Sequence, residues 1–409
     1  MILNIKFKNY RSFKGECIFT MLASPSEAKP NNVFETTTGK RLLKTAVIFG
    51  ANASGKTNII LFFYCLKRFI RHDGVKAGDD IYDYQPFKFD MDSQKKPVEF
   101  EINFITNDTV YYYNFTYDKN AIIKESLRYD SDEGQLLLFE RIIKEGKHKI
   151  KFGTLQGEKK EFEVFANQSI LSKFGYDTPH DFITPASTYL MNLNVTNAYH
   201  LDMLNTLRED VIKWIGNNQK RKDRLIELLK FADTGVNGFQ IKKRDAVVEN
   251  IVDIMVSHPL FENKIICKNS EELHFSYESY GTRNLFILGG KILQSLEEGT
   301  PIFIDELDSG FHTYISTFII ELFRNERINK KHSQLILTTH DVNLLDENVI
   351  RKDQIWFTEK DKYGASTLFS LQDFTDVKED TFFKGWYLAN KFGAVPAIQS
   401  LEKLFIEDE

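Results

Sequence analysis

The chain has 409 residues, of which 42% are hydrophobic and 27% charged, a composition typical of a globular protein with one large core or two modest ones. Its formal net charge of -5 argues against a protein that coats nucleic acid through bulk positive charge, although it leaves room for local basic patches. The three dispersed cysteines and the lack of an apolar run of roughly 20 residues exclude a disulfide framework, a closely spaced zinc cluster and a membrane-spanning helix, so we expect a cytoplasmic protein with no membrane partner.

The first predicted element is a short strand, because Ile5 and Phe7 alternate with Lys6 and Lys8. This segment lacks the continuous apolar core and the cleavage site of a signal peptide. It therefore predicts a strand of a folded domain that stays inside the cell.

The most specific pattern lies at residues 47–70. A short apolar strand at 47–49 is followed by residues 50–57, which read GANASGKT, and then by a helical segment at 58–70. This is a Walker A pattern in the strand, loop and helix context that the motif requires. Glycines let backbone N–H groups turn toward phosphates, Lys56 reaches the β and γ phosphates, and the Thr57 hydroxyl helps to hold Mg²⁺. We therefore predict that this loop binds ATP with Mg²⁺, and a plain glycine-rich turn is the alternative. The predicted nucleotide-binding residues of the loop are Gly50, Asn52, Ala53, Ser54, Gly55, Lys56 and Thr57.

The middle of the chain predicts a hairpin and then helices. Residues 98–104 and 110–117 alternate around Asn107-Asp108, which indicates an antiparallel hairpin in a side sheet. Segments 201–215 and 221–231 have helical spacing. No heptad pattern is sustained long enough to build a coiled-coil arm.

Two basic runs, 220–222 and 242–244, lie within or beside this helical region. They are compatible with binding the phosphates of DNA or RNA. The alternative is a solvated face in which acids such as Asp223 and Glu227 are interleaved. Nucleic-acid binding is therefore one of two interpretations of these basic runs.

Two further apolar strands end in polar side chains. Residues 301–304 are apolar on both faces and precede Asp305 and Glu306, a Walker B arrangement in which Asp305 orients Mg²⁺ and Glu306 polarises the attacking water. Residues 334–339 precede His340, whose imidazole is placed to hydrogen-bond a γ phosphate. We assign catalytic roles to Glu306 and His340. The alternatives are an acid-rich helix N-terminus for the two carboxylates and a structural role for the histidine.

The chemistry also predicts the organisation of the chain, because Lys56 and Asp305 must meet the same magnesium nucleotide although they lie far apart in the sequence. We predict an α/β fold with a mixed P-loop sheet flanked by helices, an antiparallel β side sheet and a helical insertion. The predicted parts are an N-terminal lobe at 1–165, the helical insertion at 166–270 and a C-terminal lobe at 271–409, with the two lobes forming one composite head.

Between the two Walker motifs, residues 278–283 read ESYGTR, and a helix is expected from about Asn284. The set of motifs resembles the ABC-class ATPases, and this hexapeptide resembles their signature sequence. The resemblance implies an ABC-type ATPase head in which Ser279 and Gly281 bind the γ phosphate held by an opposing subunit. A head-to-head dimer or a higher homo-oligomer is then the expected assembly. A plain helix cap is the alternative interpretation of the hexapeptide.

Further assignments rest on the same resemblance. The segment 9–13 resembles the one that follows the first strand in the chromosome-maintenance and break-repair branch of the class, which implies nucleotide binding by Arg11 and Ser12. Gln85 is a candidate for the glutamine that senses Mg²⁺, so the implied metal set is Thr57, Asp305 and Gln85. The alternative for Gln85 is a turn residue before proline. Asp308 matches the loop that crosses the subunit interface in this class.

More specifically, the sequence resembles a prokaryotic family of stand-alone ABC-like ATPases, related to SMC and OLD proteins, named AAA ATPases and often encoded beside nucleases in anti-phage defence loci. The resemblance covers nearly the whole chain, including residues 393–396. It implies an ATP-hydrolysing sensor or scaffold that controls a separate nuclease effector. The alternative is a DNA-repair or recombination ATPase that clamps nucleic acid. Residues 353–409 are too few for a nuclease domain in addition to the end of the head.

Overall fold

The computed structural model describes residues 1–72, 76–144, 147–153, 163–176, 178–196, 201–243 and 252–396. The chain divides into two compact units, one formed by Met1–Leu193 with Leu337–Glu409 and the other by Asn194–Ile336. We call them unit 1 and unit 2. Their boundaries follow compactness, whereas the boundaries expected from the sequence, at 165/166 and 270/271, followed the positions of the motifs.

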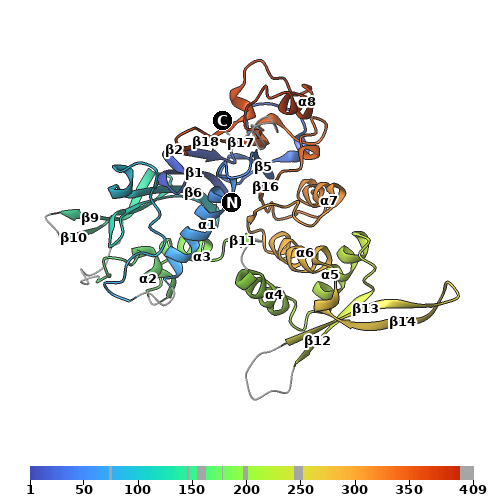
Figure 1. The fold of residues 1–409 in the computed structure, drawn as a ribbon. Helices are drawn as coiled ribbons and strands as arrows, with labels where there is room; N and C mark the ends of the chain where they lie inside the picture. The colour runs from blue at the N-terminus through green and yellow to red at the C-terminus, as the bar shows by residue number, and fades with distance from the viewer. Residues whose placement is uncertain are drawn as a thin grey trace, which may run out of the picture. The chain divides into compact units, whose positions relative to one another are not determined.

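A seven-stranded antiparallel sheet makes up most of the N-terminal part of unit 1 (Figure 1), in the order β10-β9-β8-β7-β6-β1-β2. Its strands are β1 (Ile2–Tyr10), β2 (Phe13–Thr20), β6 (Val98–Thr106), β7 (Thr109–Tyr117), β8 (Ile122–Ser131), β9 (Gly134–Lys144) and β10 (Lys147–Phe152). The hairpin expected from the sequence is β6 and β7. Its turn residues Asn107 and Asp108 both have positive φ, as a two-residue type I′ turn requires. The predicted antiparallel side sheet is therefore confirmed.

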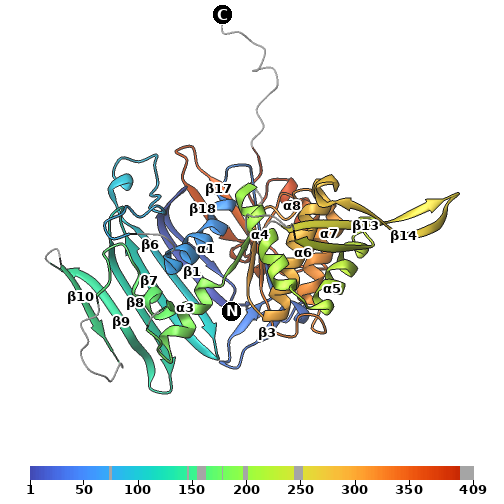
Figure 2. The ribbon, with the colours of Figure 1, turned by 90° about the horizontal axis from the view of Figure 1, so that it is seen from below.

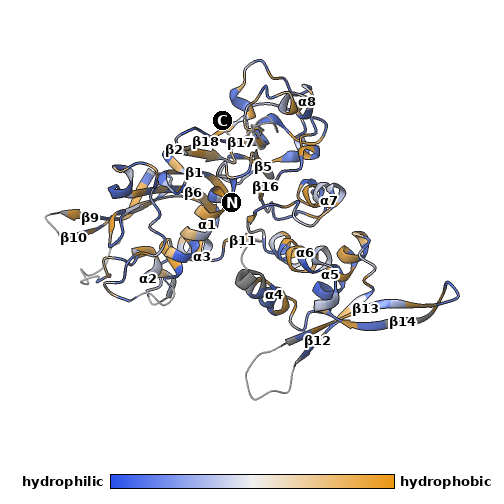
Figure 3. Ribbon diagram, in the orientation of Figure 1, coloured by the Kyte–Doolittle hydropathy of each residue, from blue (hydrophilic) through white to orange (hydrophobic). Residues whose placement is uncertain are grey.

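Helices cover one face of this sheet. They are α1 (Lys56–Arg71), α2 (Ile170–Tyr176) and α3 (Ile183–Met191), and Figure 2 shows α1 and α3 lying across the strands. Aromatic rings fill the space between α1 and the sheet, with Phe62 4.5 Å from Phe100 and Phe69 5.0 Å from Phe115 between ring centroids. Figure 3 shows α1 coloured largely as hydrophobic, as expected for a helix that buries most of its surface. The many phenylalanines of the chain thus serve here as core residues.

The strand that precedes the Walker A loop belongs to a mixed sheet in unit 1. Strand β5 (Thr45–Gly50) is buried at every position and runs parallel to β17 (Ile355–Lys360), which pairs with the antiparallel β18 (Ser366–Ser370). On the other side of β5, the N–H of Thr339 donates to the Ile48 carbonyl at 3.2 Å. A strand with neighbours on both sides and no exposed face explains the continuous apolar run at 45–49. The remaining elements of unit 1 are β3 (Val33–Glu35), β4 (Arg41–Leu43), α8 (Phe383–Leu388), η1 (Pro30–Asn32), η2 (Ser93–Lys95), η4 (Val342–Leu344), η5 (Lys352–Gln354) and η6 (Leu371–Asp373).

A buried polar network fixes α2 to the sheet of unit 1. Glu125 on β8 and Arg141 on β9 are both fully buried and form an ion pair at 2.7 Å. The Glu125 carboxylate also accepts hydrogen bonds from the Tyr113 hydroxyl at 2.9 Å and from the Ile170 N–H at 3.0 Å. Burial raises the pKa of Tyr113, so its hydroxyl keeps the proton that it donates. The charges are tolerated because each has several partners.

Unit 2 combines helices with short strands. Its elements are β11 (Asn194–Thr196), α4 (Leu201–Ile215), α5 (Gln219–Phe231), β12 (Gly238–Lys243), β13 (Val252–Glu262), β14 (Ile265–His274), η3 (Phe275–Tyr277), α6 (Tyr280–Glu298), β15 (Ile302–Ile304) and α7 (Thr313–Arg324), with β16 (Leu335–Thr338) at the unit boundary. The two helices expected at 201–231 are α4 and α5. The insertion also contains an antiparallel sheet, β12-β13-β14, which the sequence did not lead us to expect.

Candidate functional site

The Walker A loop connects β5 to α1 in unit 1, and its two glycines are required by close contacts. A Cβ atom at Gly50 would lie 2.5 Å from the Thr358 carbonyl oxygen, and one at Gly55 would lie 2.7 Å from the Ser366 Oγ. Gly55 also has a φ of +116, and Ala53 between them has a φ of +59. The absence of a side chain at Gly50 and Gly55 therefore lets the loop pack against β17 and β18.

The Lys56 side chain lies within the loop. Its Nζ donates to the Gly50 carbonyl at 2.9 Å and to the Ala51 carbonyl at 3.0 Å, and the residue is only 4% exposed. Thr57 follows in the first turn of α1, where backbone N–H groups and the helix dipole favour an anion. A tight loop, an enclosed ammonium group and a helix N-terminus fit a triphosphate with its magnesium ion.

Hydroxyl groups from distant parts of the sequence support the Walker A loop through hydrogen bonds. The Ser54 Oγ lies 2.6 Å from the Thr358 Oγ1, and the Ser366 Oγ donates to the Ser54 carbonyl at 2.6 Å. The Ser366 Oγ also lies 2.8 Å from the Ser12 Oγ. Sequence reasoning missed Thr358 and Ser366, which lie more than 300 residues from Ser54. The one local signal was a threonine directly after the apolar run 355–357.

The β1–β2 turn brings Arg11 next to Gln85. Arg11 has a φ of +52, and its N–H donates to the Gln85 carbonyl at 2.7 Å. Its Nε donates to the Tyr10 hydroxyl at 3.1 Å. Burial raises the pKa of the nearby Asp83 carboxyl, while the charges of Arg68 and Arg11 act in the opposite direction. The magnesium role of Gln85 and the nucleotide role of Arg11 stay predictions.

In unit 2, the two Walker B carboxylates directly follow β15. Asp305 is 2% exposed, and its N–H donates to the Thr196 carbonyl on the neighbouring strand at 3.1 Å. Glu306 is half-buried and has a φ of +49, a strained conformation for a side chain of this size. Its carbonyl accepts from the Ser309 N–H at 2.9 Å, which closes the following turn around Asp308. The strain supports a functional interpretation of this position.

The hexapeptide resembling a signature packs against the same turn. Ser279 is exposed and caps α6 by accepting from the Thr282 N–H at 3.1 Å, so the helix begins at Tyr280, earlier than expected. A Cβ atom at Gly281 would lie 2.7 Å from the Gly310 carbonyl oxygen, which leaves no room for a side chain. The helix cap that the alternative interpretation required is therefore present at Ser279. In addition, Gly281 is needed for close packing.

The predicted site residues are divided between the units, with His340 exposed after β16. Unit 1 holds Arg11, Ser12, Gln85, His340 and the loop residues Gly50, Asn52, Ala53, Ser54, Gly55, Lys56 and Thr57. Unit 2 holds Ser279, Gly281, Asp305 and Glu306. Each group is therefore assembled by its own unit from the elements described above.

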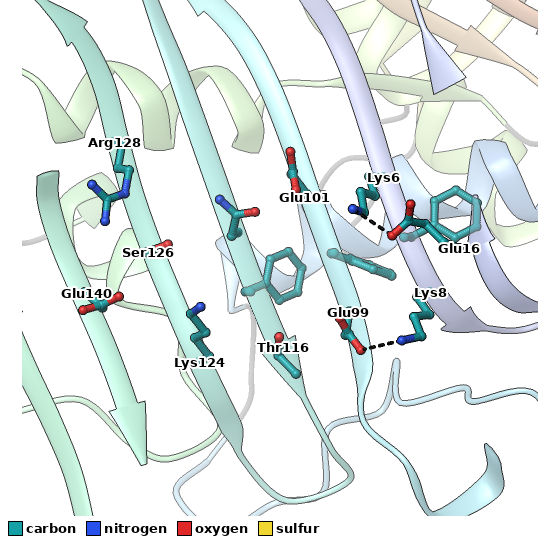
Figure 4. A pocket seen from close by; sticks show the side chains of 14 residues that line it. Lys6, Lys8, Glu16, Glu99, Glu101, Thr116, Lys124, Ser126, Arg128 and Glu140 are labelled. Atoms are coloured by element: carbon teal, nitrogen blue, oxygen red, sulfur yellow. Dashed lines mark ion pairs between the residues drawn. The ribbon is translucent and has the colours of Figure 1, made fainter. Parts of the chain in front are cut away.

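A shallow depression of about 360 Å³ lies on the seven-stranded sheet of unit 1. Figure 4 shows charged side chains from adjacent strands along it, with ion pairs from Lys6 to Glu16 at 2.7 Å and from Lys8 to Glu99 at 3.6 Å. None of the predicted site residues lines it. Paired charges of opposite sign satisfy each other across the strands, so this surface has the character of a solvated sheet face.

Two further features concern the part of the chain that the structure describes. There, no group of three or more His, Cys, Asp and Glu side chains has the arrangement of a metal site. Magnesium needs no such group, because it is usually bound through one or two protein ligands together with substrate phosphates. Over the same residues, no helix combines the length and the apolar character needed to cross a membrane.

Comparison with known proteins gives one family and several distant structures. Residues 46–346 match the family described as "AAA domain, putative AbiEii toxin, Type IV TA system". No protein among those of curated function matches the sequence. The fold is similar to an SMC head bound to the C-winged helix domain of ScpA, with 14% identity, a TM-score of 0.44 and coverage of 90% of this chain and 97% of that one. It is also similar to the SMC head domain from Thermotoga maritima, with 14% identity, a TM-score of 0.40 and coverage of 90% of this chain and 98% of that one. A further similar structure is the Smc head domain with a coiled coil and joint from Pyrococcus yayanosii, with 12% identity, a TM-score of 0.42 and coverage of 95% of this chain and 99% of that one.

Proposed function

The chain belongs to the AAA-domain family that it matches over residues 46–346, and on that basis we propose that it binds and hydrolyses ATP with Mg²⁺ as a switch whose heads close on the nucleotide. The observation that carries the proposal is the Walker A loop, in which the Lys56 ammonium group donates to the Gly50 and Ala51 carbonyls and close packing requires glycine at 50 and 55. A loop of this shape presents backbone N–H groups and one ammonium group to an anion.

Each motif has a defined role in this proposal. Lys56 neutralises the phosphates, and Thr57 and Asp305 hold Mg²⁺, with Gln85 as a third candidate. Glu306 accepts a proton from the attacking water, and His340 contacts the γ phosphate. Bound Mg²⁺ supplies the charge stabilisation that lets the phosphoryl group transfer.

A second copy of the chain completes the site. The exposed Ser279 and the N-terminus of α6 offer a hydroxyl and backbone N–H groups to an anion, which suits a γ phosphate held by another molecule. The partner is therefore the chain itself, in a head-to-head dimer or a larger homo-oligomer. A ligand that favours the closed form by about 5.5 kcal/mol shifts such a two-state equilibrium almost completely.

The first test compares hydrolysis and binding in Glu306→Gln. We expect ATP hydrolysis to fall by about 100- to 10,000-fold, because the variant lacks the general base, while ATP still binds. Lys56→Ala is the matched variant that loses binding itself. Hydrolysis by Glu306→Gln at the rate of the unchanged protein would show that Glu306 is not the base.

We further propose that the closed dimer controls a separate nuclease in anti-phage defence. The support is the resemblance of the sequence to ATPases encoded beside nucleases. Co-expression with the protein encoded by the neighbouring gene tests it, and we expect a complex whose nuclease activity depends on Lys56. A neighbour that neither associates nor cleaves nucleic acid would contradict this model.

The second candidate is a DNA-repair or recombination ATPase that clamps nucleic acid. It is favoured by the basic residues Lys220, Arg221 and Lys222 at the start of α5, although Arg221 already pairs with Glu297 at 2.6 Å. The other basic run ends at Arg244, which lies outside the described residues. ATP-dependent binding of duplex DNA by Glu306→Gln, weakened steeply by salt, would favour this candidate over the first.

A further inference from the structure

Three polar side chains and one main-chain carbonyl form a continuous chain of hydrogen bonds between the β1–β2 turn and the Walker A loop. The Asn58 Nδ2 donates to the Ser12 Oγ at 2.7 Å. The Ser12 Oγ lies 2.8 Å from the Ser366 Oγ, which donates to the Ser54 carbonyl at 2.6 Å. Ser366 is only 5% exposed, and Ser54 only 2%. These bonds therefore link the loop, the first turn of α1, the β1–β2 turn and β18.

The Ser366 hydroxyl is the donor at the centre of this chain. It is placed to donate both to the Ser12 Oγ and to the Ser54 carbonyl. Ser12 accepts from Asn58 on its other side. Removing the Ser366 hydroxyl therefore breaks the link between the β1–β2 turn and the Walker A loop.

The Ser12 side chain is held by two donors. Its Oγ accepts from Asn58 on α1 and from Ser366 on β18. A main-chain bond reinforces the same contact, because the Ser366 N–H donates to the Ser12 carbonyl at 2.7 Å. Arg11 directly precedes Ser12, so fixing Ser12 also fixes the turn from which Arg11 extends.

We propose that Ser366 is a positioning residue for the nucleotide, which holds the Arg11–Ser12 turn against the Walker A loop at Ser54. Ser12 is held in place by the same link. This role rests on the proposed nucleotide binding, and it makes residues of β18 and of the β1–β2 turn determinants of the affinity for the nucleotide.

The chain offers a matched control on the same strand. Ser370, at the other end of β18, is also buried, and its hydroxyl donates to the Ile355 carbonyl at 3.3 Å. It makes no hydrogen bond to the Walker A loop or to Ser12 in the described part of the chain. Ser370→Ala therefore removes a buried hydroxyl from β18 without touching the link.

The experiment measures the dissociation constant of a fluorescent, non-hydrolysable ATP analogue with Mg²⁺, together with the melting temperature without nucleotide. We expect Ser366→Ala to weaken binding by about 3- to 10-fold, and Ser370→Ala by less than about twofold, even if both lower the melting temperature. In the double variant with Arg11→Ala, the combined loss should be smaller than the product of the single losses, because Ser366 acts through Arg11.

Two outcomes overturn the inference while nucleotide binding itself stands. One is Ser366→Ala with the affinity of the unchanged protein, and the other is an equal loss in Ser370→Ala, which would indicate a general effect on the fold. If instead the unchanged protein does not bind the analogue, or Lys56→Ala binds it equally well, the proposed function fails.

Discussion

The Walker A loop of unit 1 and the turns of unit 2 that contain Gly281 and Glu306 are supported in different ways. The loop is held by the hydroxyl groups of Thr358 and Ser366, which are remote in sequence, and Ser366 also bonds to Ser12. In unit 2, Gly281 and Gly310 approach each other closely, and the Asn284 side chain donates to the Ser309 carbonyl at 3.1 Å. The loop thus depends on the complete fold of unit 1, whereas the turns of unit 2 depend on small residues at close contacts.

This difference predicts different ways to damage the two regions. In unit 1, buried polar groups such as Glu125 and Ser366 should be the sensitive points, because they bond to partners from several elements. In unit 2, substitutions that add side-chain volume should be the most damaging, because backbone atoms there already lie at contact distance. The following substitutions test both statements, beginning with the largest expected effect.

The strongest test of the polar support in unit 1 is Glu125→Ala. It leaves Arg141 buried without its carboxylate and removes the acceptor for the N–H of Ile170, so we expect a loss of about 3–5 kcal/mol of unfolding free energy. Glu99→Ala on the same sheet is the control, because its ion pair with Lys8 is half-exposed and should contribute at most about 1 kcal/mol. Denaturant unfolding followed by circular dichroism measures both. Equal losses in the two variants would contradict the view that burial sets the cost.

The volume test in unit 2 is Gly281→Ala. The new Cβ would lie 2.7 Å from the Gly310 carbonyl oxygen, so we expect a loss of about 1–3 kcal/mol and weaker ATP-dependent association. Gly15→Ala is the matched control, since nothing lies within 4 Å of a Cβ atom there. Unfolding curves and sedimentation velocity with ATP report the two effects. A Gly281→Ala protein that associates with ATP like the unchanged one would show that this contact is not needed.

The smallest expected effect is a pH dependence at the start of α3 in unit 1. The Nδ1 atom of His180 accepts from the N–H groups of Phe182 and Ile183, both at 3.1 Å, and protonation would remove this acceptor. Burial lowers the pKa of His180, while Asp181 acts in the opposite direction. A histidine whose folded pKa lies below its unfolded value contributes its full stability above the unfolded value, near 6.5, and loses it as the pH falls through the folded pKa.

His180→Asn keeps an acceptor at this position and removes the titration. We therefore expect the unchanged protein to lose melting temperature relative to His180→Asn as the pH falls from about 8 to about 5. A constant difference over that range would show that folding does not shift the pKa of His180.

The sequence was informative where function and local pattern coincide. The strand, glycine loop and helix at 45–71 were predictable because the motif fixes their order, and the β6–β7 hairpin because Asn107-Asp108 fits a type I′ turn. The α/β fold with its mixed sheet and antiparallel side sheet followed from these elements, and it is confirmed.

Other features of the fold and of the site could not be predicted from short sequence patterns. Ser366 and Thr358 reach the loop only through the pairing of β17 with β5 and β18, and no short pattern encodes that pairing. The sheet β12-β13-β14 was missed because the helices before it suggested that the helical pattern continued. The strained φ of Glu306 is likewise a property of the folded turn and not of the residue type.

The central claim is that one molecule supplies Lys56 and a second supplies Ser279 to the same nucleotide. Mixing two inactive variants, Lys56→Ala and Ser279→Arg, tests it most directly by the steady-state rate of ATP hydrolysis. In a mixed dimer, one site combines an intact Walker A loop with an intact Ser279, so the account predicts recovery toward roughly a quarter of the sites of the unchanged protein. A mixture as inactive as its two components, although mixed dimers form, would contradict it.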